Sequence, residues 1–465
     1  MCLAFIAWAY LTRYQSKGIQ RLTMAATIFL PVGFWVFLRT DGMDADTHQM
    51  IAWRWAKSPE EKLLAHTDNK MKSLPADSAL MASKPEWTGF RGVNRDDVVH
   101  GVRIGTDWNK TPPVEMWRRP VGPGCSSFAV HGPFLYTQEQ RGESEMVTCY
   151  EINTGEMVWK HGDNVRFWDS HAGAGPRSTP TLYNGRVFTM GATGILNVLD
   201  AYTGSLIWEC DAAAAAGVKV LTWGFTGSPL VVDNTVIVSL SGALAGYDAT
   251  TGKLIWSVAD GGNSYSSPQL VTIEGVTQVI FMSKAGALSV DPQSGKQLWN
   301  YSWPISDRIV QPAVIEGGDL LIPGIASEVR RINVSHVAEV WQIKETWSSQ
   351  AMKLYFNDVI VSKGYAYGFD GAVITCLDLN NGARKWRGAP YRGFTILLAD
   401  QDLLLVLTEK GDLALVEAKP DRFRELGKIK ALNARTWNVP AMAGNIVVVR
   451  NSSEMVAYRL PGTVD

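Results

Sequence analysis

The chain has 465 residues with a formal net charge of −1 at pH 7, and its composition is rich in tryptophan (18) and glycine (43). Lysine and arginine are spread along the chain without a basic stripe, which argues against nucleic acid or another anionic polymer as its partner. So many glycines are typical of a fold built from short strands and turns.

Two apolar segments open the chain. Residues 22–38 are free of charge over 17 positions, which is the lower limit for a helix that spans a bilayer. Residues 1–11 are equally apolar but would reach only about 16 Å as a helix at 1.5 Å per residue. We predict a membrane anchor over residues 1–41, with a transmembrane helix at 22–38. The first segment is either a partial apolar helix or part of a segment that starts further upstream.

The charges that flank these segments predict how the anchor is oriented. Three basic residues lie between the segments and three acidic residues follow the second: Arg13, Lys17, Arg21, Asp41, Asp44 and Asp46. The positive-inside rule places the basic loop in the cytoplasm and the following domain outside it, in the periplasm of a bacterium. A cleaved signal peptide is the alternative. Because no A-x-A-like site follows Leu38, we favour an uncleaved anchor.

A polar linker with one short helix is predicted over residues 42–86. Within SPEEKLLAH at 58–66, Ser58 is a suitable N-cap, Pro59 occupies the first helical position and Glu61 completes a capping box. The stretch LPADSALMASKP at 74–85 has the composition of a linker. The whole segment is long enough to hold the following domain away from the membrane.

From residue 87 to residue 465 the chain is dominated by a motif that returns about every 42 to 49 residues. Five clear copies are present: YEINTGEMVW at 150–159, LDAYTGSLIW at 199–208, YDATTGKLIW at 247–256, VDPQSGKQLW at 290–299 and LDLNNGARKW at 377–386. A degenerate copy, RINVSHVAEVW at 331–341, fills the gap in the series. This period with strand-like content predicts an all-β fold, a β-propeller of four-stranded antiparallel blades.

Each copy is consistent with two strands joined by a tight hairpin. In LDAYTGSLIW, Gly204 supplies the positive φ that the turn needs. Trp208 then ends the outermost strand of a blade, where it packs against the neighbouring blade. The same structural role in blade docking is predicted for seven tryptophans: Trp117, Trp159, Trp208, Trp256, Trp299, Trp341 and Trp386.

Two apolar strands, often opened by Ser or Thr before Pro, lie between successive tryptophans. Eight inner strands start near Ser126, Ser178, Gly227, Ser266, Gln311, Val359, Ile396 and Val439. The last unit, 437–460, has no outer strand of its own, and VEMWRRPV at 114–121 has the right content to supply it. We therefore predict an eight-bladed ring that closes by pairing an N-terminal strand with a C-terminal strand.

The residues that usually mark catalytic or metal chemistry are dispersed. Five cysteines occur, at Cys2, Cys125, Cys149, Cys210 and Cys376, without a C-x-x-C, an adjacent pair or a haem-attachment motif. Cys149 and Cys376 alternate with apolar neighbours and are interpreted as buried, while a disulfide between two of the later four cysteines stays open. The seven histidines show no metal-ligand spacing. No catalytic or metal-binding residue is therefore predicted.

The D-x-x-T-G-x-x-x-W repeat resembles the pyrrolo-quinoline quinone (PQQ) repeat family. Three further stretches look like a membrane-anchored bacterial branch of that family: WTGFRGVNRDD from Trp87, YTQEQRGESE at 136–145 and GPRSTPT at 175–181. The resemblance covers about residues 87–460. It implies an eight-bladed propeller, as in outer-membrane assembly lipoproteins of the BamB type and in quinoprotein alcohol dehydrogenases.

The resemblance also implies which residues the chain would need in order to act as a quinoprotein dehydrogenase. These enzymes carry a vicinal disulfide beneath the cofactor, a Glu/Asn/Asp set on calcium and often a haem motif. This chain lacks the Cys–Cys pair and the haem motif, and no calcium set can be placed on matching positions.

Two functions from different classes follow. The first is a membrane-tethered propeller that acts as a non-catalytic binding or scaffold module for a protein or glycan partner, without a cofactor. The alternative is a dehydrogenase-like enzyme that uses the central funnel with PQQ and calcium. In either case the loops that lead into the inner strands gather on one face. Their aromatic and arginine side chains are the candidate binding residues: Trp168, His171, Arg177, Trp223, Tyr265, Arg308, Arg392 and Trp437.

Overall fold

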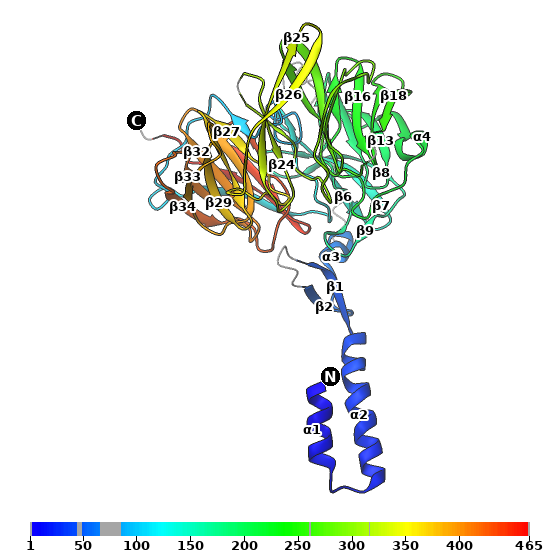
Figure 1. The fold of residues 1–465 in the computed structure, drawn as a ribbon. Coiled ribbons are helices and arrows are strands. Elements are labelled where there is room, and N and C mark those ends of the chain that lie inside the picture. Colours follow the sequence, from blue (N-terminus) through cyan, green and yellow to red (C-terminus); the bar gives the residue numbers. More distant parts are fainter. Residues whose placement is uncertain (1, 44–48, 66–84, 260–261, 316, 464–465) are drawn as a thin grey trace.

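The computed structural model describes residues 2–43, 49–65, 85–259, 262–315 and 317–463 (Figure 1). Residues 85–463 form a body of sheets, from which a pair of N-terminal helices projects. Among its described residues the body is built from strands, apart from the four-residue helix α4 (Ala212–Ala215). The predicted all-β class is therefore confirmed.

Six of the sheets contain four strands that lie side by side in chain order. The first holds β5 (Ala129–His131), β6 (Phe134–Arg141), β7 (Ser144–Glu151) and β8 (Met157–Asp163). The second holds β11 (Thr181–Tyr183), β12 (Arg186–Met190), β13 (Ile195–Asp200) and β14 (Leu206–Asp211). The third holds β15 (Leu230–Val232), β16 (Thr235–Leu240), β17 (Ala243–Asp248) and β18 (Leu254–Ala259).

The next three sheets repeat this antiparallel order. The fourth holds β19 (Gln269–Ile273), β20 (Val276–Ser283), β21 (Gly286–Val290) and β22 (Gln297–Ser302). The fifth holds β23 (Ala313–Val314), β24 (Leu320–Pro323), β25 (Val329–Val337) and β26 (Val340–Ser349). The sixth holds β27 (Ile360–Ser362), β28 (Tyr365–Asp370), β29 (Val373–Asp378) and β30 (Arg384–Arg387).

The last two sheets recruit strands from before the first repeat. In the seventh, β3 (Val98–Val99) runs parallel to β31 (Gly393–Leu398), which is followed by β32 (Leu403–Thr408), β33 (Asp412–Glu417) and β34 (Glu425–Lys430). The eighth holds β35 (Ala441–Ala443), β36 (Ile446–Arg450), β37 (Glu454–Arg459) and β4 (Val114–Pro120). Because β37 pairs with β4 in antiparallel register, Ala457 opposite Trp117, the predicted closure by residues 114–121 is confirmed.

The hydrophobic core is divided into clusters that lie between neighbouring sheets. Met190 and Leu196 of the second sheet share one buried cluster with Val236 and Val238 of the third. Alternate residues of each strand face the two neighbours, as the two-residue period of a strand requires. Middle strands such as β16 are therefore buried on both faces, whereas outermost strands such as β14 are largely exposed.

The repeated tryptophan joins one sheet to the next. The Trp159 ring is 5% exposed, and its indole N–H donates to the carbonyl of Ala201, 3.2 Å away in the turn of the following repeat. Gly204 lies against the same ring, since a Cβ there would be 2.5 Å from a ring carbon. The glycine is thus needed for close packing as well as for its positive φ of 73°. The tryptophan is the third residue of β8 rather than its end, which corrects the predicted position.

The degenerate repeat does not place Trp341 in this docking role. Residues 331–341 belong instead to the long β25–β26 hairpin, where Trp341 stacks on His336 with ring centroids 4.3 Å apart. Trp347 docks in its place: its indole N–H donates to the Leu379 carbonyl at 2.8 Å, and a Cβ on Gly382 would be 2.7 Å from its ring. The extended hairpin moves the contact with the next turn six residues along the chain, while Trp341 packs, partly buried, against the core cluster between the fourth and fifth sheets.

Hydroxyl groups at the start of the inner strands link neighbouring sheets. The backbone N–H of Ser127 donates to Thr179 Oγ1 at 3.0 Å, and that of Thr179 donates to Ser228 Oγ at 2.9 Å. The N–H of Ser228 in turn donates to Ser267 Oγ at 2.9 Å. This chain of hydrogen bonds explains why Ser or Thr precedes proline at these positions.

A segment that precedes the first sheet crosses the body. The backbones of Trp87 and Val130 exchange two hydrogen bonds, and Thr88 accepts one from Leu182. Further along, β3 pairs with β31 in the seventh sheet. We call residues 86–99 the plug, because they connect inner strands from opposite ends of the sequence. The plug was visible in the sequence only as the family-like stretch WTGFRGVNRDD.

The N-terminal region begins with two helices that lie side by side, α1 (Cys2–Thr12) and α2 (Lys17–Val36) (Figure 1). Trp8 Nε1 donates to Thr23 Oγ1 at 2.9 Å and joins them. By length and composition α2 could cross a membrane. It starts five residues before the predicted helix at 22–38 and ends two residues earlier.

The described part of the predicted linker is in contact with the body. A hairpin of β1 (Leu38–Met43) and β2 (Gln49–Trp53) begins within the predicted anchor and continues into the linker, and α3 (Pro59–Ala65) follows it. The predicted capping box is confirmed: Ser58 N–H donates to Glu61 Oε2 at 2.6 Å, and Glu61 N–H donates to Ser58 Oγ at 3.0 Å. Most of the stretch at 74–85 lies outside the described residues.

Replacing Glu60 with alanine is expected to loosen α3 from the body. The carboxylate accepts two hydrogen bonds from Arg166, at 2.8 and 2.9 Å, and one from the Gly142 amide at 2.8 Å. Because the arginine is partly exposed, we expect a loss of about 1.4 kcal/mol, hence roughly tenfold faster proteolysis of residues 54–65. Asp421→Ala, which removes an exposed carboxylate elsewhere, serves as control. Equal cleavage rates in the two variants would contradict this contact.

Two short strands complete the fold near the face to which β1 is attached. They are β9 (Trp168–Asp169) and β10 (Gly173–Ala174), which pair with each other. The carbonyl of His171, in the turn between them, accepts a hydrogen bond from the Met43 backbone N–H at 3.2 Å. The end of β1 is therefore fixed to the loop that leads into β11.

Candidate functional site

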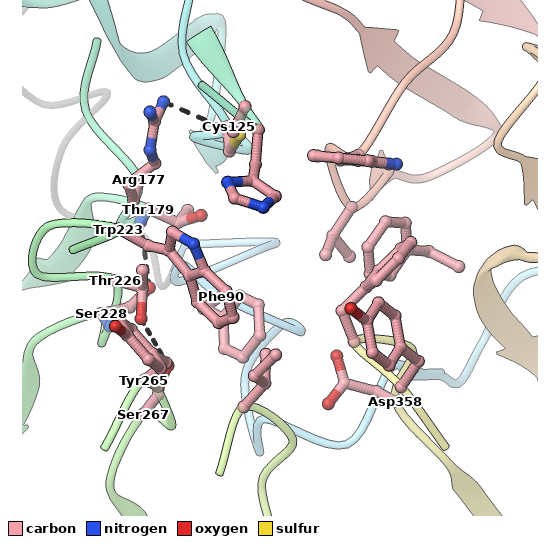
Figure 2. A pocket seen from close by; sticks show the side chains of 18 of the residues that line it. Phe90, Cys125, Arg177, Thr179, Trp223, Thr226, Ser228, Tyr265, Ser267 and Asp358 are labelled. Carbon is pink, nitrogen blue, oxygen red and sulfur yellow. Dashed lines mark hydrogen bonds between the residues drawn. The ribbon is translucent and has the colours of Figure 1, made fainter. Parts of the chain in front are cut away.

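A cavity of about 230 Å³ opens where the loops that lead into the inner strands converge (Figure 2). Five of the predicted binding residues line it: His171, Arg177, Trp223, Tyr265 and Trp437. They come from the loops before β11, β15, β19 and β35. The fold thus brings together side chains that are far apart in the sequence. We call this space the funnel cavity.

The other three predicted residues lie elsewhere. Trp168 is 52% exposed and lines a second cavity of about 680 Å³, which shares Cys125 and Trp437 with the funnel cavity. Arg308 is 1% exposed and donates to the carbonyls of Trp303, Pro323 and Ser283, so it connects its own loop to the ends of β20 and β24. Neither it nor Arg392, which lies 3.5 Å from Glu409, lines the funnel cavity. Backbone carbonyls attract the Arg308 guanidinium, and the Glu409 carboxylate attracts that of Arg392, so both groups turn away from the cavity.

One wall of the funnel cavity is a contiguous aromatic surface. The rings of Trp223 and Tyr265 lie 4.6 Å apart between centroids, and His171 meets Trp223 edge-on at 5.9 Å. Figure 2 shows Trp223 and Tyr265 on the side of the cavity opposite Asp358. Rings at these distances support one another and present a rigid apolar surface.

A second group of rings that also lines the cavity was missed from the sequence. Phe356 lies 5.5 Å from Trp437 and 6.0 Å from Phe394 between ring centroids, with Tyr355 beside it at 5.5 Å. The available signal was YFND at 355–358, directly before an inner strand. It occupies the same loop position as the residues that were predicted.

The one guanidinium group among the predicted residues of the cavity is already neutralised. Arg177 Nη2 donates to Asp169 Oδ2 at 2.6 Å and to the Gly173 carbonyl at 2.6 Å, and both charged side chains are buried. The pair spans the β9–β10 turn and holds His171 at the rim. Arg177 therefore stabilises the wall rather than offering a free positive charge to a ligand.

The plug supplies the floor of the funnel cavity. Phe90 lines the cavity directly, and the next residue, Arg91, donates to Asp97 Oδ2 at 2.5 Å and lies 3.7 Å from Asp358. Burial raises the pKa of Asp97 to about 7, against the attraction of Arg91. Burial also raises the pKa of Asp358. One buried cation is thus shared between two carboxyl groups beneath the cavity.

A second arginine of the plug is held by backbone groups. Arg95 donates to the carbonyls of Ser228, Pro229 and Pro268, at the entrances of the third and fourth sheets. Burial, followed by the charge of Arg91, lowers the pKa of Arg95 to about 9. These bonds attach the plug to inner strands on the side of the body away from β31.

The stability of the fold is expected to fall with rising pH because of Glu145 on β7. Burial raises the pKa of this carboxyl to about 7, and Oε1 has no partner among the described residues. Its stabilising contribution is complete below about pH 4.5 and is lost as pH rises through 7. Glu145→Gln should therefore flatten the decline by about 2 to 3 kcal/mol. Unfolding midpoints measured from pH 4.5 to 8 test this, and parallel curves for both proteins would contradict it.

The residues present do not fit PQQ held on calcium. The carboxylates that line the funnel cavity, Asp169 and Asp358, each face an arginine, and Cys125 is followed by serine. In the part of the chain that the structure describes, a single group of His, Asp and Glu is spaced to hold a metal ion: His161, Asp163 and Glu209. These residues lie on the outer strands β8 and β14, outside the cavity lining.

Comparison with known proteins identifies relatives of two kinds. Outer membrane protein assembly factor BamB of Yersinia pestis is 21% identical over 311 residues, which are 63% of this chain and 65% of the relative. Quinohemoprotein alcohol dehydrogenase ADH-IIG of Pseudomonas putida is 29% identical over 125 residues, 25% of this chain and 17% of the relative. The chain spans less than two thirds of the length of either relative.

Solved structures share the fold at low sequence identity. BamB from Moraxella catarrhalis superposes with a TM-score of 0.53 and 14% identity, over 76% of this chain and 99% of that one. Quinohemoprotein alcohol dehydrogenase from Comamonas testosteroni superposes with a TM-score of 0.62 and 12% identity, over 88% and 85%. Similarity at such low sequence identity supports a shared fold and does not establish a shared function.

A family model assigns the chain to a family. The model described as outer membrane protein assembly factor BamB matches residues 143–388, more than half of the chain. Its range contains the five clear copies of the repeat and the extended β25–β26 hairpin. The protein belongs to this family of PQQ-repeat β-propellers.

Proposed function

We propose that the protein is a membrane-tethered, extracytoplasmic scaffold whose propeller binds a protein or glycan partner at the mouth of the funnel cavity, without catalysis. Each of the sheets described above is one blade of an eight-bladed ring in this proposal. The ring holds the loops before the inner strands in a fixed arrangement around one axis. The partner then meets a preformed surface rather than a flexible one.

The observation that carries the proposal is the composition of the funnel cavity. Its walls are aromatic groups such as Trp223, Tyr265, Phe356 and Trp437, and the charged groups that line it are paired within the protein. Rigid aromatic side chains are the residues that most often anchor protein interfaces, and they also stack on sugar rings. No nucleophile paired with a general base lines the cavity among the described residues. The arrangement therefore suits binding better than chemistry.

Two further observations support the tether and the location. The 20 residues of α2 span about 30 Å, the thickness of the hydrocarbon core of a bilayer. Relatives of the chain in Yersinia pestis and Moranella endobia are outer membrane protein assembly factors by name. We propose a bacterial membrane anchor with the propeller in the periplasm, and a protein rather than a glycan as the first partner to seek.

The alternative function, a PQQ-dependent dehydrogenase, rests on the shared fold. Because the cavity offers neither an adjacent cysteine pair nor unpaired carboxylates for calcium, we propose that no PQQ is bound. The purified chain should reduce no dye with alcohols or sugars after PQQ and calcium are added. Turnover that requires both additions would establish the alternative.

Titration of a captured partner tests the scaffold function. The partner is isolated from membranes with the tethered chain and identified by mass spectrometry, and its affinity is then measured for wild type and for Trp223→Ala. Removing a central aromatic anchor typically costs 2 kcal/mol or more, so we expect affinity to fall about thirtyfold. Trp341→Ala, on the β25–β26 hairpin, is the matched control. Wild-type affinity for Trp223→Ala with wild-type melting would reject the funnel site.

A further inference from the structure

An exposed group of aromatic side chains surrounds the end of α2. Trp53 and Trp55, on and just after β2, stack with ring centroids 4.8 Å apart. Phe34 of α2 lies 5.6 Å from Trp53, and Phe37 lies 5.7 Å from Trp55. We call Phe34, Phe37, Trp53 and Trp55 the aromatic collar.

The collar is unusual because it packs mainly on itself and remains open to solvent. Trp55 is 66% exposed and Trp53 is 41% exposed. Such large rings are normally buried in a soluble domain, whereas tryptophan is enriched at the boundary between hydrocarbon and headgroups of a membrane. The collar lies at the end of α2 that is nearer the body (Figure 1). That end is where an outward-facing membrane boundary would fall.

The collar is firmly connected to α2. The helix ends at Val36 and β1 begins at Leu38, so one residue separates them. Arg54 N–H donates to the Phe37 carbonyl at 2.8 Å, and Arg54 Nε donates to the Leu38 carbonyl at 3.0 Å. The β1–β2 hairpin is therefore a continuation of the helix rather than a free tether.

The other end of the hairpin is attached to the mouth of the funnel cavity. Met43 lines the cavity, and its N–H donates to the His171 carbonyl. From β2, Met50 Sδ accepts from Arg435 Nε at 3.3 Å, and the Arg435 guanidinium lies over Trp437, 4.1 Å from its ring centroid. Since β1 has six residues, the collar and the mouth are about 20 Å apart along it.

We infer that the aromatic collar lies in the headgroup region of the bilayer and that the hairpin holds the mouth of the funnel cavity facing that bilayer. This inference rests on the membrane tether in the proposed function. It adds an orientation: the partner enters the funnel from the membrane surface, so it is a segment of a membrane protein. The β25–β26 hairpin, at the opposite end of the molecule from α2 in Figure 1, points away from the lipid.

Energy transfer to labelled lipids tests the orientation on the full chain in lipid nanodiscs. A donor fluorophore is attached at Thr222→Cys, beside Trp223 at the mouth, or at Val337→Cys in the β25–β26 hairpin; both positions are exposed. The acceptor is a headgroup-labelled phospholipid, and Cys2, Cys125 and Cys210 are replaced by serine in both proteins. The nine residues of β25 alone span about 30 Å, so transfer at position 222 should exceed that at 337 by about twofold or more. Equal or greater transfer at 337 would overturn the orientation.

A paired substitution tests the collar itself. Trp53→Ser with Trp55→Ser should lower transfer from position 222, because the hairpin loses its hold on the headgroup region. The matched control, Val337→Ser with Val340→Ser, removes two exposed apolar side chains at the far end and should change nothing. Both pairs are solvent-exposed, so melting should stay at the wild-type value. Unchanged transfer in the tryptophan pair would overturn the role of the collar.

Failure of the tether is recognised separately. Flotation of the full chain with vesicles after washing in high salt reports on the anchor alone. A chain that does not float contradicts the proposed tether and the inference with it. A chain that floats but gives more transfer at position 337 contradicts only the orientation.

Discussion

Replacing Trp159 with alanine is expected to lower the free energy of unfolding by about 3 to 5 kcal/mol, the range for removing a large buried aromatic side chain. The ring is 5% exposed, fills the space against Gly204 in the next sheet and donates to the Ala201 carbonyl. Its loss leaves a cavity between two sheets and removes one of the two hydrogen bonds that the Ala201 carbonyl accepts, the other coming from the Tyr136 hydroxyl at 3.0 Å. Denaturant unfolding of the detergent-solubilised chain, followed by circular dichroism, gives the value.

Trp341 provides the matched control for this prediction. Its ring stacks on His336 in the extended hairpin and docks no neighbouring turn. Because Trp341 is only partly buried, against the cluster between the fourth and fifth sheets, alanine there should cost less, about 1 to 2 kcal/mol. If Trp341→Ala proved as damaging as Trp159→Ala, the assignment of docking to Trp347 would be wrong.

Replacing Arg91 with methionine is expected to cost about 3 to 5 kcal/mol, the range for breaking a buried ion pair by removing one partner. Methionine preserves much of the side-chain length but leaves Asp97 and Asp358 without their shared cation in a buried site. The same change at the exposed Arg103, which donates to the Asp400 carbonyl, should cost well under 1 kcal/mol.

The loss at Arg91 should also depend on pH. The pKa of Asp97 is already raised to about 7 in the folded protein, and removing the guanidinium raises it further. Stability of Arg91→Met should therefore recover as pH falls through that raised value, because protonation neutralises the buried carboxyl group. Comparing unfolding midpoints at pH 8 and pH 5 checks this. A loss that is equal at both pH values would show that packing, not charge, explains the effect.

The fold was largely predictable because the repeat signal is local. A turn glycine such as Gly204 shapes its own hairpin, and a tryptophan such as Trp208 packs on the hairpin of the next repeat. Each ten-residue copy of the repeat is therefore enough to predict two strands and the turn between them. The contact with the next turn shifts in the fifth sheet because its outer hairpin, which turns at Val337 and Val340, has no turn glycine. There the hairpin between β25 and β26 lengthened, and Trp347 took the docking position.

The sequence predicts which face of the fold carries the candidate site, because that face follows from the order of the strands. It does not predict the direction of each side chain. Trp223, Tyr265 and Trp437 could be placed on one face because each precedes an inner strand. The direction of the Arg308 side chain could not be predicted, since it depends on carbonyl groups in its own loop and at the ends of β20 and β24 that no sequence pattern marks. The same rule applies to Phe356, which precedes the inner strand β27 and lines the cavity.

The plug and the N-terminal hairpin could not be predicted from periodicity. Residues 86–99 contact inner strands that are distant in sequence: they bond to Val130 in β5 and to Leu397 in β31. Likewise Met43 reaches the funnel cavity through a contact with His171. Each of these two segments occurs only once in the described chain, so its structure cannot be predicted by comparison with another copy.

Site-specific photocrosslinking in intact cells is the most direct test of the scaffold function. A benzophenone side chain is placed at the position of Trp223 or Trp437 in the funnel cavity, or at that of Val337 in the β25–β26 hairpin. We expect one discrete crosslinked product, containing a membrane protein, from each funnel position and none from position 337. A defined product from position 337 with none from the funnel positions would contradict the proposed function.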